Sequence, residues 1–374
     1  MSTPLSLDLG SSYLRLGLRD PHKGLPRMLV LDTANPGGTL PAYFAPGLSK
    51  GLVIGSSAAA LRGRSPVYSL ADVKRLFGLA AENSHKNQNR FAAPWQWDEA
   101  KQAWLRLEHA AWKPDEILGI FLQALQAEAL ALLKQAPESV VVTVPIYFSP
   151  ASCARLLVLI REKFGVPVAL MSDSLAAAHA YSFCGGTKKI VAIYHLGAGN
   201  FEFALVDLSH AEPVVLAEVS DPFLGGDHFD HQLAKRLAAE IKKRSQVDLM
   251  EEGVSADHVR MEAERGKRAL TYRGSTDVKI MNRGKHVDYS VAISSFELKA
   301  LVQDLIDQSL NLCQQACRQA GLEPGKVEDF MLAGGMTRMP AVRQAVETFF
   351  GKHATLYPNP DEVTVIGALR PVKK

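Results

Sequence analysis

The sequence contains little cysteine and almost no excess of charge. Its four cysteines form no pattern typical of a disulfide framework or a metal site, and we interpret Cys313 and Cys317 as packing thiols on a helix. Reduced thiols of this kind predict a cytoplasmic protein. The formal net charge of +3 is spread over 374 residues, which argues against nucleic acid as a partner.

The sequence also shows no membrane span and no leader segment. No run approaches the roughly 18 apolar residues that cross a bilayer, so we expect no membrane partner. No basic segment precedes the first apolar stretch, and Asp8 interrupts that stretch, so we expect no signal peptide. With 47% apolar and 22% charged residues the composition is that of a folded protein, and the length indicates at least two domains.

Two similar strand–turn–strand segments stand out. They run from Leu5 to Leu18 and from Ala192 to Leu208, and each joins two apolar strands through a turn of small residues. When the two are aligned, Asp8 of the first falls on His195 of the second. The duplication predicts two similar lobes that hold one ligand between them. The mismatch makes the two hairpins chemically unequal.

Several glycine turns could bring backbone N–H groups close to an anion. They lie at residues 10–12 and 197–200, at Gly225-Gly226 before a predicted helix, and at residues 334–335 after a predicted strand. A helix start adds a favourable dipole for phosphate. Each turn alone is also typical of an ordinary tight turn. The set as a whole favours a phosphate-binding cleft.

Two charged segments have an ordinary and a functional interpretation. In ERGKRALT the residues Glu264, Lys267, Arg268 and Thr271 share one helix face, which in isolation is typical of a solvated surface with ion pairs. Lys74 in DVKRLFG would by default be a surface lysine. Only the combination with other motifs gives these residues a functional interpretation.

Nine segments, in order and at similar spacing, carry a family resemblance. They are LDLGSS, DVKRLFG, VVVTVPIYF, LAAAHAY, YHLGAGNFE, FLGGDHFD, ERGKRALT, AGGMTRMPAV and NPDEVTVIGA. From Leu5 to Leu369 the chain resembles the nucleotide-binding domain of the 70-kilodalton heat-shock (DnaK-type) chaperones, within the actin-like ATPase superfold. The resemblance implies binding of ATP or ADP with Mg²⁺.

The resemblance also implies roles for individual residues. The catalytic positions are held by Lys74, Asp173, Asp8 and His195, and Asp8 also stands at the metal position. The nucleotide-binding positions are held by Gly10, Ser11, Ser12, Tyr13, Gly197, Gly199, Asn200, Gly225, Gly226, Glu264, Lys267, Arg268, Thr271, Gly334, Gly335, Met336, Arg338 and Asp361.

The departures from the family pattern cluster at the reaction centre. His195, Ala198 and Asn200 replace aspartate, glycine and threonine, and Asp173 replaces a glutamate that reaches about 1.5 Å further. Mg²⁺ prefers carboxylate and water oxygens, whereas histidine offers nitrogen. We therefore expect a weakened or altered Mg²⁺ site and slow or absent hydrolysis. Cys153 and Ser174 also replace an arginine and a proline that relay the nucleotide state.

The predicted fold is α/β, a two-lobed actin-like ATPase in which each lobe is a mixed five-stranded sheet flanked by helices. Lobe I would cover residues 1–186 with a subdomain inserted at about 35–112. Lobe II would cover 187–374 with a subdomain inserted at about 227–295. The family's peptide-binding domain has no counterpart here, so we expect any chaperone role to act through another protein. The four tryptophans between residues 79 and 112 indicate a packed subdomain or a partner surface.

Three functional hypotheses follow. The first is an ATP-binding, chaperone-family protein that closes on nucleotide and regulates or scaffolds a protein partner of unknown identity. The second is a slow ATPase, and the third is an interaction protein without enzymatic activity. A sugar or carboxylate kinase of the same superfold would need an acceptor pocket and a base, and no segment indicates either.

Overall fold

The computed structural model describes most of the chain, namely residues 4–19, 26–33, 35, 37–47, 51–62, 66–88, 91, 93–107, 110–250, 253–282 and 287–369. Two expectations concern residues outside this described part. One is about a leader at residues 1–3, and the other is about the end of the chain at residues 370–374.

A mixed sheet forms the centre of lobe I. Its strand order is β12-β11-β1-β2-β3, with β1 parallel to β11 and antiparallel to β2. The strands are β1 (Leu5–Leu9), β2 (Tyr13–Arg19), β3 (Pro26–Met28), β11 (Val140–Val144) and β12 (Val168–Ser172). The short strand β4 (Leu40–Pro41) also pairs with β2, so this sheet has six strands where the sequence predicted five.

A second mixed sheet, with strand order β15-β14-β13-β18-β19, forms the centre of lobe II. Its strands are β13 (Ile190–Leu196), β14 (Phe201–Asp207), β15 (Val214–Asp221), β18 (Asp329–Ala333) and β19 (Thr355–Leu356). Both predicted hairpins are therefore present. Their registers place Asp8 opposite Arg15 in one hairpin and His195 opposite Glu202 in the other.

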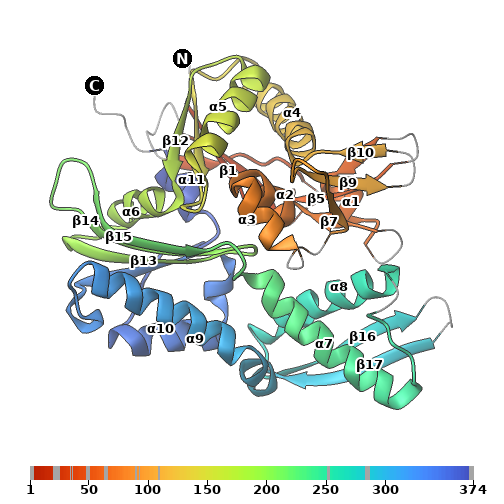
Figure 1. The fold of residues 1–374 in the computed structure, drawn as a ribbon. Helices are drawn as coiled ribbons and strands as arrows, with labels where there is room; N and C mark the ends of the chain where they lie inside the picture. Colours follow the sequence, from red (N-terminus) through yellow and green to blue (C-terminus); the bar gives the residue numbers. More distant parts are fainter. Residues whose placement is uncertain are drawn as a thin grey trace.

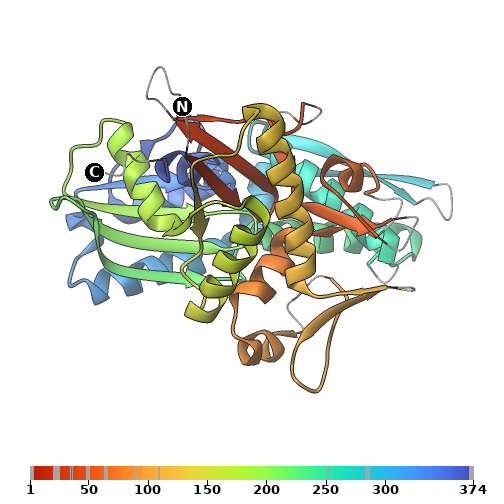
Figure 2. The same ribbon diagram turned by 90° about the horizontal axis from the view of Figure 1, so that it is seen from above.

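Helices cover the outer faces of both sheets and fill the space between them (Figures 1 and 2). Lobe I carries α4 (Pro114–Leu133) and α5 (Pro150–Phe164), and lobe II carries α9 (Ser295–Gln319) and α10 (Pro340–Phe350). Between the lobes, α6 (Asp173–Phe183) packs against α11 (Val363–Gly367). A hydrogen bond from Ser6 Oγ to the Val365 carbonyl, at 2.7 Å, ties α11 to the first sheet.

One helix contradicts the expectation that no segment could cross a membrane. By length and composition α4 is long and apolar enough to cross a membrane, with a mean hydropathy of 1.5 over 18 residues. In the structure 39% of that window is buried, and Ile117, Phe121 and Leu125 belong to the apolar core of lobe I. A core helix of a folded domain can be equally long and apolar.

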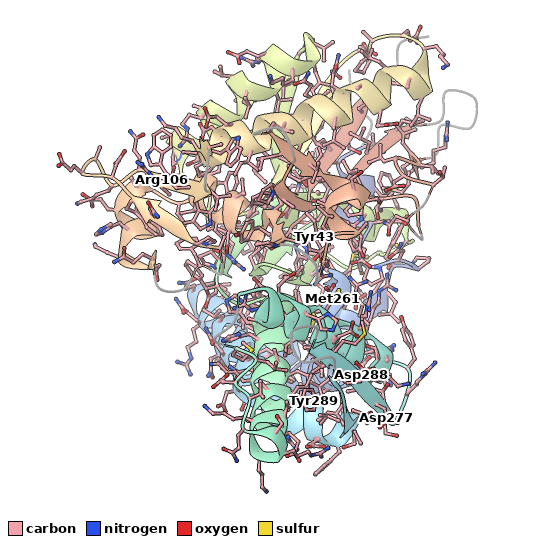
Figure 3. The ribbon with its side chains drawn as sticks, turned by 90° about the vertical axis from the view of Figure 1, so that its right-hand side faces the viewer. Tyr43, Arg106, Met261, Asp277, Asp288 and Tyr289 are labelled. Carbon is pink, nitrogen blue, oxygen red and sulfur yellow. The ribbon has the colours of Figure 1, made fainter. Side chains whose placement is uncertain are left out.

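Each lobe extends into an arm on the same side of the molecule. The lobe I arm, residues 43–112, contains β5 (Tyr43–Pro46), β6 (Leu52–Ile54), α1 (Gly55–Ala59), β7 (Tyr68–Ser69), α2 (Leu70–Gly78), α3 (Ala81–Lys86), β8 (Trp95–Trp97), β9 (Ala103–Leu107) and β10 (Ala110–Trp112). The lobe II arm, residues 226–294, contains α7 (Gly226–Ser245), α8 (Gly253–Leu270), β16 (Ser275–Asn282) and β17 (Val287–Ser294). Figure 3 shows Tyr43 of the first arm above Met261 of the second.

The crossing of α6 and α11 predicts a strong effect of one added methyl group. A Cβ on Gly367 would lie 1.7 Å from the Ala176 carbonyl oxygen, and backbone cannot move aside as a side chain can. We expect Gly367→Ala to cost about 3 kcal/mol, the upper range for overpacked cores, measured by urea unfolding. Gly325→Ala, whose Cβ would meet no atom within 4 Å, is the control and should change stability by less than about 1 kcal/mol. Equal effects of the two would contradict this packing.

Candidate functional site

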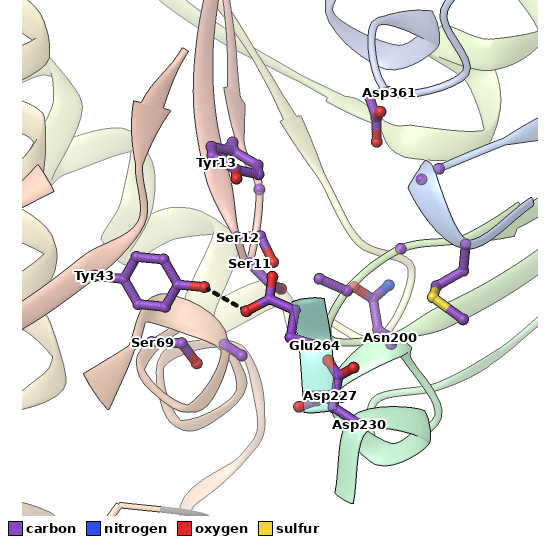
Figure 4. A pocket seen from close by; sticks show the side chains of 18 of the residues that line it. Ser11, Ser12, Tyr13, Tyr43, Ser69, Asn200, Asp227, Asp230, Glu264 and Asp361 are labelled. Carbon is purple, nitrogen blue, oxygen red and sulfur yellow. Dashed lines mark hydrogen bonds between the residues drawn. The ribbon is translucent and has the colours of Figure 1, made fainter. Parts of the chain in front are cut away.

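A cleft of about 1520 Å³ lies between the lobes and is lined by residues of both. All the residues that the sequence predicted for the site line this cleft except Gly199 and Gly225. Figure 4 shows residues of its wall, with the turn at Ser11 and Ser12 on one side and Asn200 near the other. The chain folding thus brings together residues that are far apart in the sequence.

The two hairpin turns touch each other at the base of the cleft. A Cβ on Gly199 would lie 2.4 Å from Ser11 Oγ, and one on Gly10 would lie 2.3 Å from the Tyr13 carbonyl oxygen. A side chain on Gly199 would push the two turns apart, and one on Gly10 would distort the first turn itself. Gly199 therefore lies behind Ser11 and does not line the cleft.

The start of α7 has its backbone donors engaged within the protein. The N–H groups of Gly226 and Asp227 donate to the carbonyls of Gly197 and Ala198, at 3.0 and 2.9 Å. The Gly225 N–H donates to His228 Nδ1 at 3.3 Å. In this structure the amides of Gly226 and Asp227 hold the second hairpin turn, and an anion would have to displace these contacts to use the three amides.

Arg75, on α2, fastens the lobe I arm to lobe II. It is buried and donates hydrogen bonds to the carbonyls of Gly199 and Pro222, at 2.6 and 2.5 Å. It also forms ion pairs with Asp72 at 2.9 Å and with Asp227 at 2.5 Å. The guanidinium thus has partners in both lobes, and its position depends on both.

A second set of contacts joins the arms at the mouth of the cleft. Glu264 on α8 accepts hydrogen bonds from Arg62 at 2.8 Å and Tyr43 at 3.3 Å, the latter drawn in Figure 4. Burial would raise the pKa of Glu264, but Arg62, Arg268 and Lys267 outweigh burial and hold this pKa at about 2. The carboxylate therefore stays charged at neutral pH and holds the two arms together.

The remaining α8 residues lie along one wall. Lys267 is buried and contacts the Gly226 carbonyl at 3.0 Å and Asp230 at 2.9 Å. Burial raises the pKa of Asp230 to about 6, against the opposing charge of Lys267. Arg268 donates to Tyr13 of lobe I at 3.1 Å and pairs with Glu264 at 2.8 Å. The interpretation of this helix face as a solvated surface is thus wrong for Lys267 and Glu264.

The opposite wall is the turn after β18. Gly334 has a φ of +84°, and its Cβ would lie 2.3 Å from the Leu196 carbonyl oxygen. A Cβ on Gly335 would lie 2.6 Å from Asp361 Oδ1. Arg338 donates to Asp361 at 2.7 Å and to Asn359, so the turn is fixed to the loop before α11. The narrow space explains why both positions are glycine.

The floor of the cleft carries the residues that the sequence assigned to catalysis. Asp8 is buried beside Arg15, with an Nη1–Oδ2 distance of 3.3 Å. Burial raises the pKa of Asp8, and Arg15 and Lys74 oppose that effect. Lys74 is buried, so its interpretation as a surface lysine is wrong. Burial also lowers the pKa of His195, which favours the neutral imidazole at neutral pH.

Glu202 is the main residue that the sequence interpretation missed here. It is 1% exposed, opposes His195 in the hairpin register and lies close to Asp173. Burial and then Asp173 raise the pKa of Glu202 well above its ordinary value. Its signal in the sequence was its alignment with Arg15 of the first hairpin. Arg75, Tyr43 and Arg62 were missed too, because their partners lie in the other lobe.

The comparison with known families gives a match over most of the chain. A family model described as Hsp70 protein matches residues 5–370, which is nearly the whole chain.

The burial of Arg75 predicts how strongly the lobes depend on it. We expect Arg75→Ala to cost about 3–5 kcal/mol in urea unfolding, because the loss leaves Asp72 and Asp227 without their cation. Arg343→Ala is the control, since Arg343 is 43% exposed in its pair with Glu347 and should cost less than about 1 kcal/mol. Losses of the same size in both variants would show that Arg75 does not fasten the lobes.

Proposed function

The chain belongs to the Hsp70 family, and on this premise we propose that its lobes close on an adenine nucleotide to regulate or scaffold a protein partner, with weak or no hydrolysis. Domains of this family bind ATP or ADP with Mg²⁺ and have a chaperone-type function. The observation that carries the proposal is the cleft between the lobes, which is lined by nearly all the residues that the family resemblance singled out.

On the adenosine side, the two walls of the cleft are suited to a flat base and a ribose. Arg268 offers a planar guanidinium that is about half exposed, and Arg338 also lines the cleft. Guanidinium groups stack on aromatic faces and donate hydrogen bonds. Glu264 and Lys267 supply an acceptor and a donor for the ribose hydroxyls.

On the phosphate side, the chain keeps positive charge and small turns but changes the carboxylates. Lys74 stays available as a cation at the floor, and the serine hydroxyls of Ser11 and Ser12 line the cleft. Asp8 is paired with Arg15, and His195 stands at an aspartate position of the family. Phosphoryl transfer depends on exact placement of charge around the reacting phosphate. These changes support binding with slow or absent turnover.

Lobe closure gives the nucleotide a way to act on a partner. The arms meet through Arg62, Tyr43 and Glu264 at the mouth and through Arg75 deeper in the cleft. A nucleotide that competes for these groups would change the separation of the arms. A ligand shifts such an equilibrium only by its differential affinity for the two states. A partner whose affinity depends on the positions of the arms would then bind differently when nucleotide is present.

A slow ATPase is the second candidate. Lys74 is retained, and Asp173 keeps the negative charge of the family's glutamate; both are buried at the cleft floor and favour some residual hydrolysis. We also propose a cytoplasmic location, which fits the four free cysteines.

The nucleotide proposal predicts a specific loss of affinity. Calorimetry should show ATP and ADP binding with micromolar or lower Kd, and Arg268→Ala should weaken it roughly 10- to 100-fold because a charged hydrogen bond is lost. The control Arg273→Ala changes an exposed arginine outside the cleft and should leave the Kd unchanged. No binding by the wild type, with or without Mg²⁺, would leave only a non-enzymatic interaction protein.

A further inference from the structure

Three metal-ligating side chains from both lobes meet at the floor of the cleft. Asp173 begins α6, His195 lies near the end of β13 and Glu202 follows the start of β14. One ligand atom from each lies within 4.8 Å of the others. Ligand atoms this close together can converge on a single cation.

Each of these residues also has a buried polar atom that no protein group satisfies. Within the described part of the chain, Asp173 Oδ1, His195 Nδ1 and Glu202 Oε2 have no hydrogen-bond partner. Asp173 is 2% exposed and Glu202 is 1% exposed. Buried polar atoms are nearly always paired, so three of them in one cluster indicate a missing partner.

Two hydrogen bonds fix the carboxylate of Glu202 in the way that neighbouring residues fix a metal-binding carboxylate. Its Oε1 accepts hydrogen bonds from Asn200 Nδ2 at 3.0 Å and from the Ile146 N–H at 3.1 Å. Both donors use the same oxygen and leave Oε2 for another partner. Metal-ligating carboxylates are typically oriented by such hydrogen bonds.

The donor set does not fit Mg²⁺, the cation of the family. Mg²⁺ demands octahedral oxygen ligation and keeps several waters, whereas this cluster includes an imidazole. Asp8, the other carboxylate of the floor, is paired with Arg15 at 3.3 Å. One imidazole with two carboxylates instead suits zinc and its neighbours among the divalent transition metals.

The floor holds more acidic than basic side chains. Asp8, Asp173 and Glu202 bring three carboxyl groups to it, beside the two basic residues Arg15 and Lys74. Asp173 and His195 line the cleft, so an ion could enter from solvent.

We propose that Asp173, His195 and Glu202 bind a divalent transition metal of the zinc type directly. Because Asp173 belongs to lobe I and the other two belong to lobe II, the ion ties the lobes together at the floor of the cleft. Three protein ligands leave a fourth position open for water or a phosphate oxygen. This inference goes beyond the proposed function, since the ion needs no nucleotide in order to bind.

The test is metal binding by the full chain after removal of metals with EDTA and without nucleotide. Titration with Zn²⁺ should give one site by calorimetry, and Co²⁺ should give visible absorption bands. His195→Asn should weaken Zn²⁺ binding by at least the 10- to 100-fold that loss of an outer-shell residue already costs. Zn²⁺ should raise the Tm of the wild type but not that of this variant.

Matched variants separate this site from surface binding. His353→Asn removes an exposed histidine that lies 3.5 Å from Glu347, and it should keep full Zn²⁺ affinity. His195→Asp gives a ligand set made only of oxygen atoms, so this variant should lose affinity for Zn²⁺ and gain affinity for Mg²⁺. Glu202→Gln is a second probe, nearly equal in size to the native residue, should His195→Asn fail to fold.

Three results would overturn the inference. They are no Zn²⁺ binding by the wild type, equal Zn²⁺ affinity in wild type, His195→Asn and Glu202→Gln, or a Co²⁺ spectrum of an octahedral, all-oxygen ion. The spectrum decides even if neither variant folds. ATP binding measured separately in EDTA distinguishes the two proposals. A chain that binds ATP but no zinc loses only this inference.

Discussion

The buried guanidinium of Arg75 is the interaction on which the cleft depends. It comes from the lobe I arm, yet its hydrogen bonds reach the Gly199 and Pro222 carbonyls and the Asp227 carboxylate of lobe II. A buried charge of this kind is favourable only when every donor is paired. The second hairpin turn and the start of α7 are therefore held in one arrangement with the lobe I arm. The contacts of Arg62 and Tyr43 with Glu264 add a second connection at the mouth of the cleft.

Each hairpin pairs an acidic residue with a basic one across its two strands, but the order along the chain is reversed. In the first, the acid Asp8 precedes its cross-strand partner Arg15, and in the second His195 precedes the acid Glu202. Arg15 engages Asp8, while burial keeps His195 neutral and leaves Glu202 short of a cation. The floor of the cleft thus combines a neutralised acid with an imidazole–carboxylate cluster. That combination separates nucleotide binding from hydrolysis in our interpretation.

Local patterns predicted the parts of the fold that depend on local sequence. The duplicated hairpins and the buried strand β11 follow from apolar periodicity, and nearly every residue that the motifs singled out lines the cleft. The extra strand β4 was missed because two residues carry no periodic signal. Arg75 and Glu202 were missed because their roles depend on partners in the other lobe or across a strand. Long-range pairing of charge is set by tertiary packing, and spacing in the sequence does not encode it.

The central claim is that the cleft holds ATP without hydrolysing it efficiently, because His195 stands where the family has a carboxylate. A single-turnover experiment tests it most directly, with protein in excess over radiolabelled ATP and with Mg²⁺ present. We predict that the label bound to the wild type stays in ATP for hours, whereas His195→Asp converts its bound label to ADP and phosphate much faster. Hydrolysis by the wild type at the rate of His195→Asp would contradict the claim.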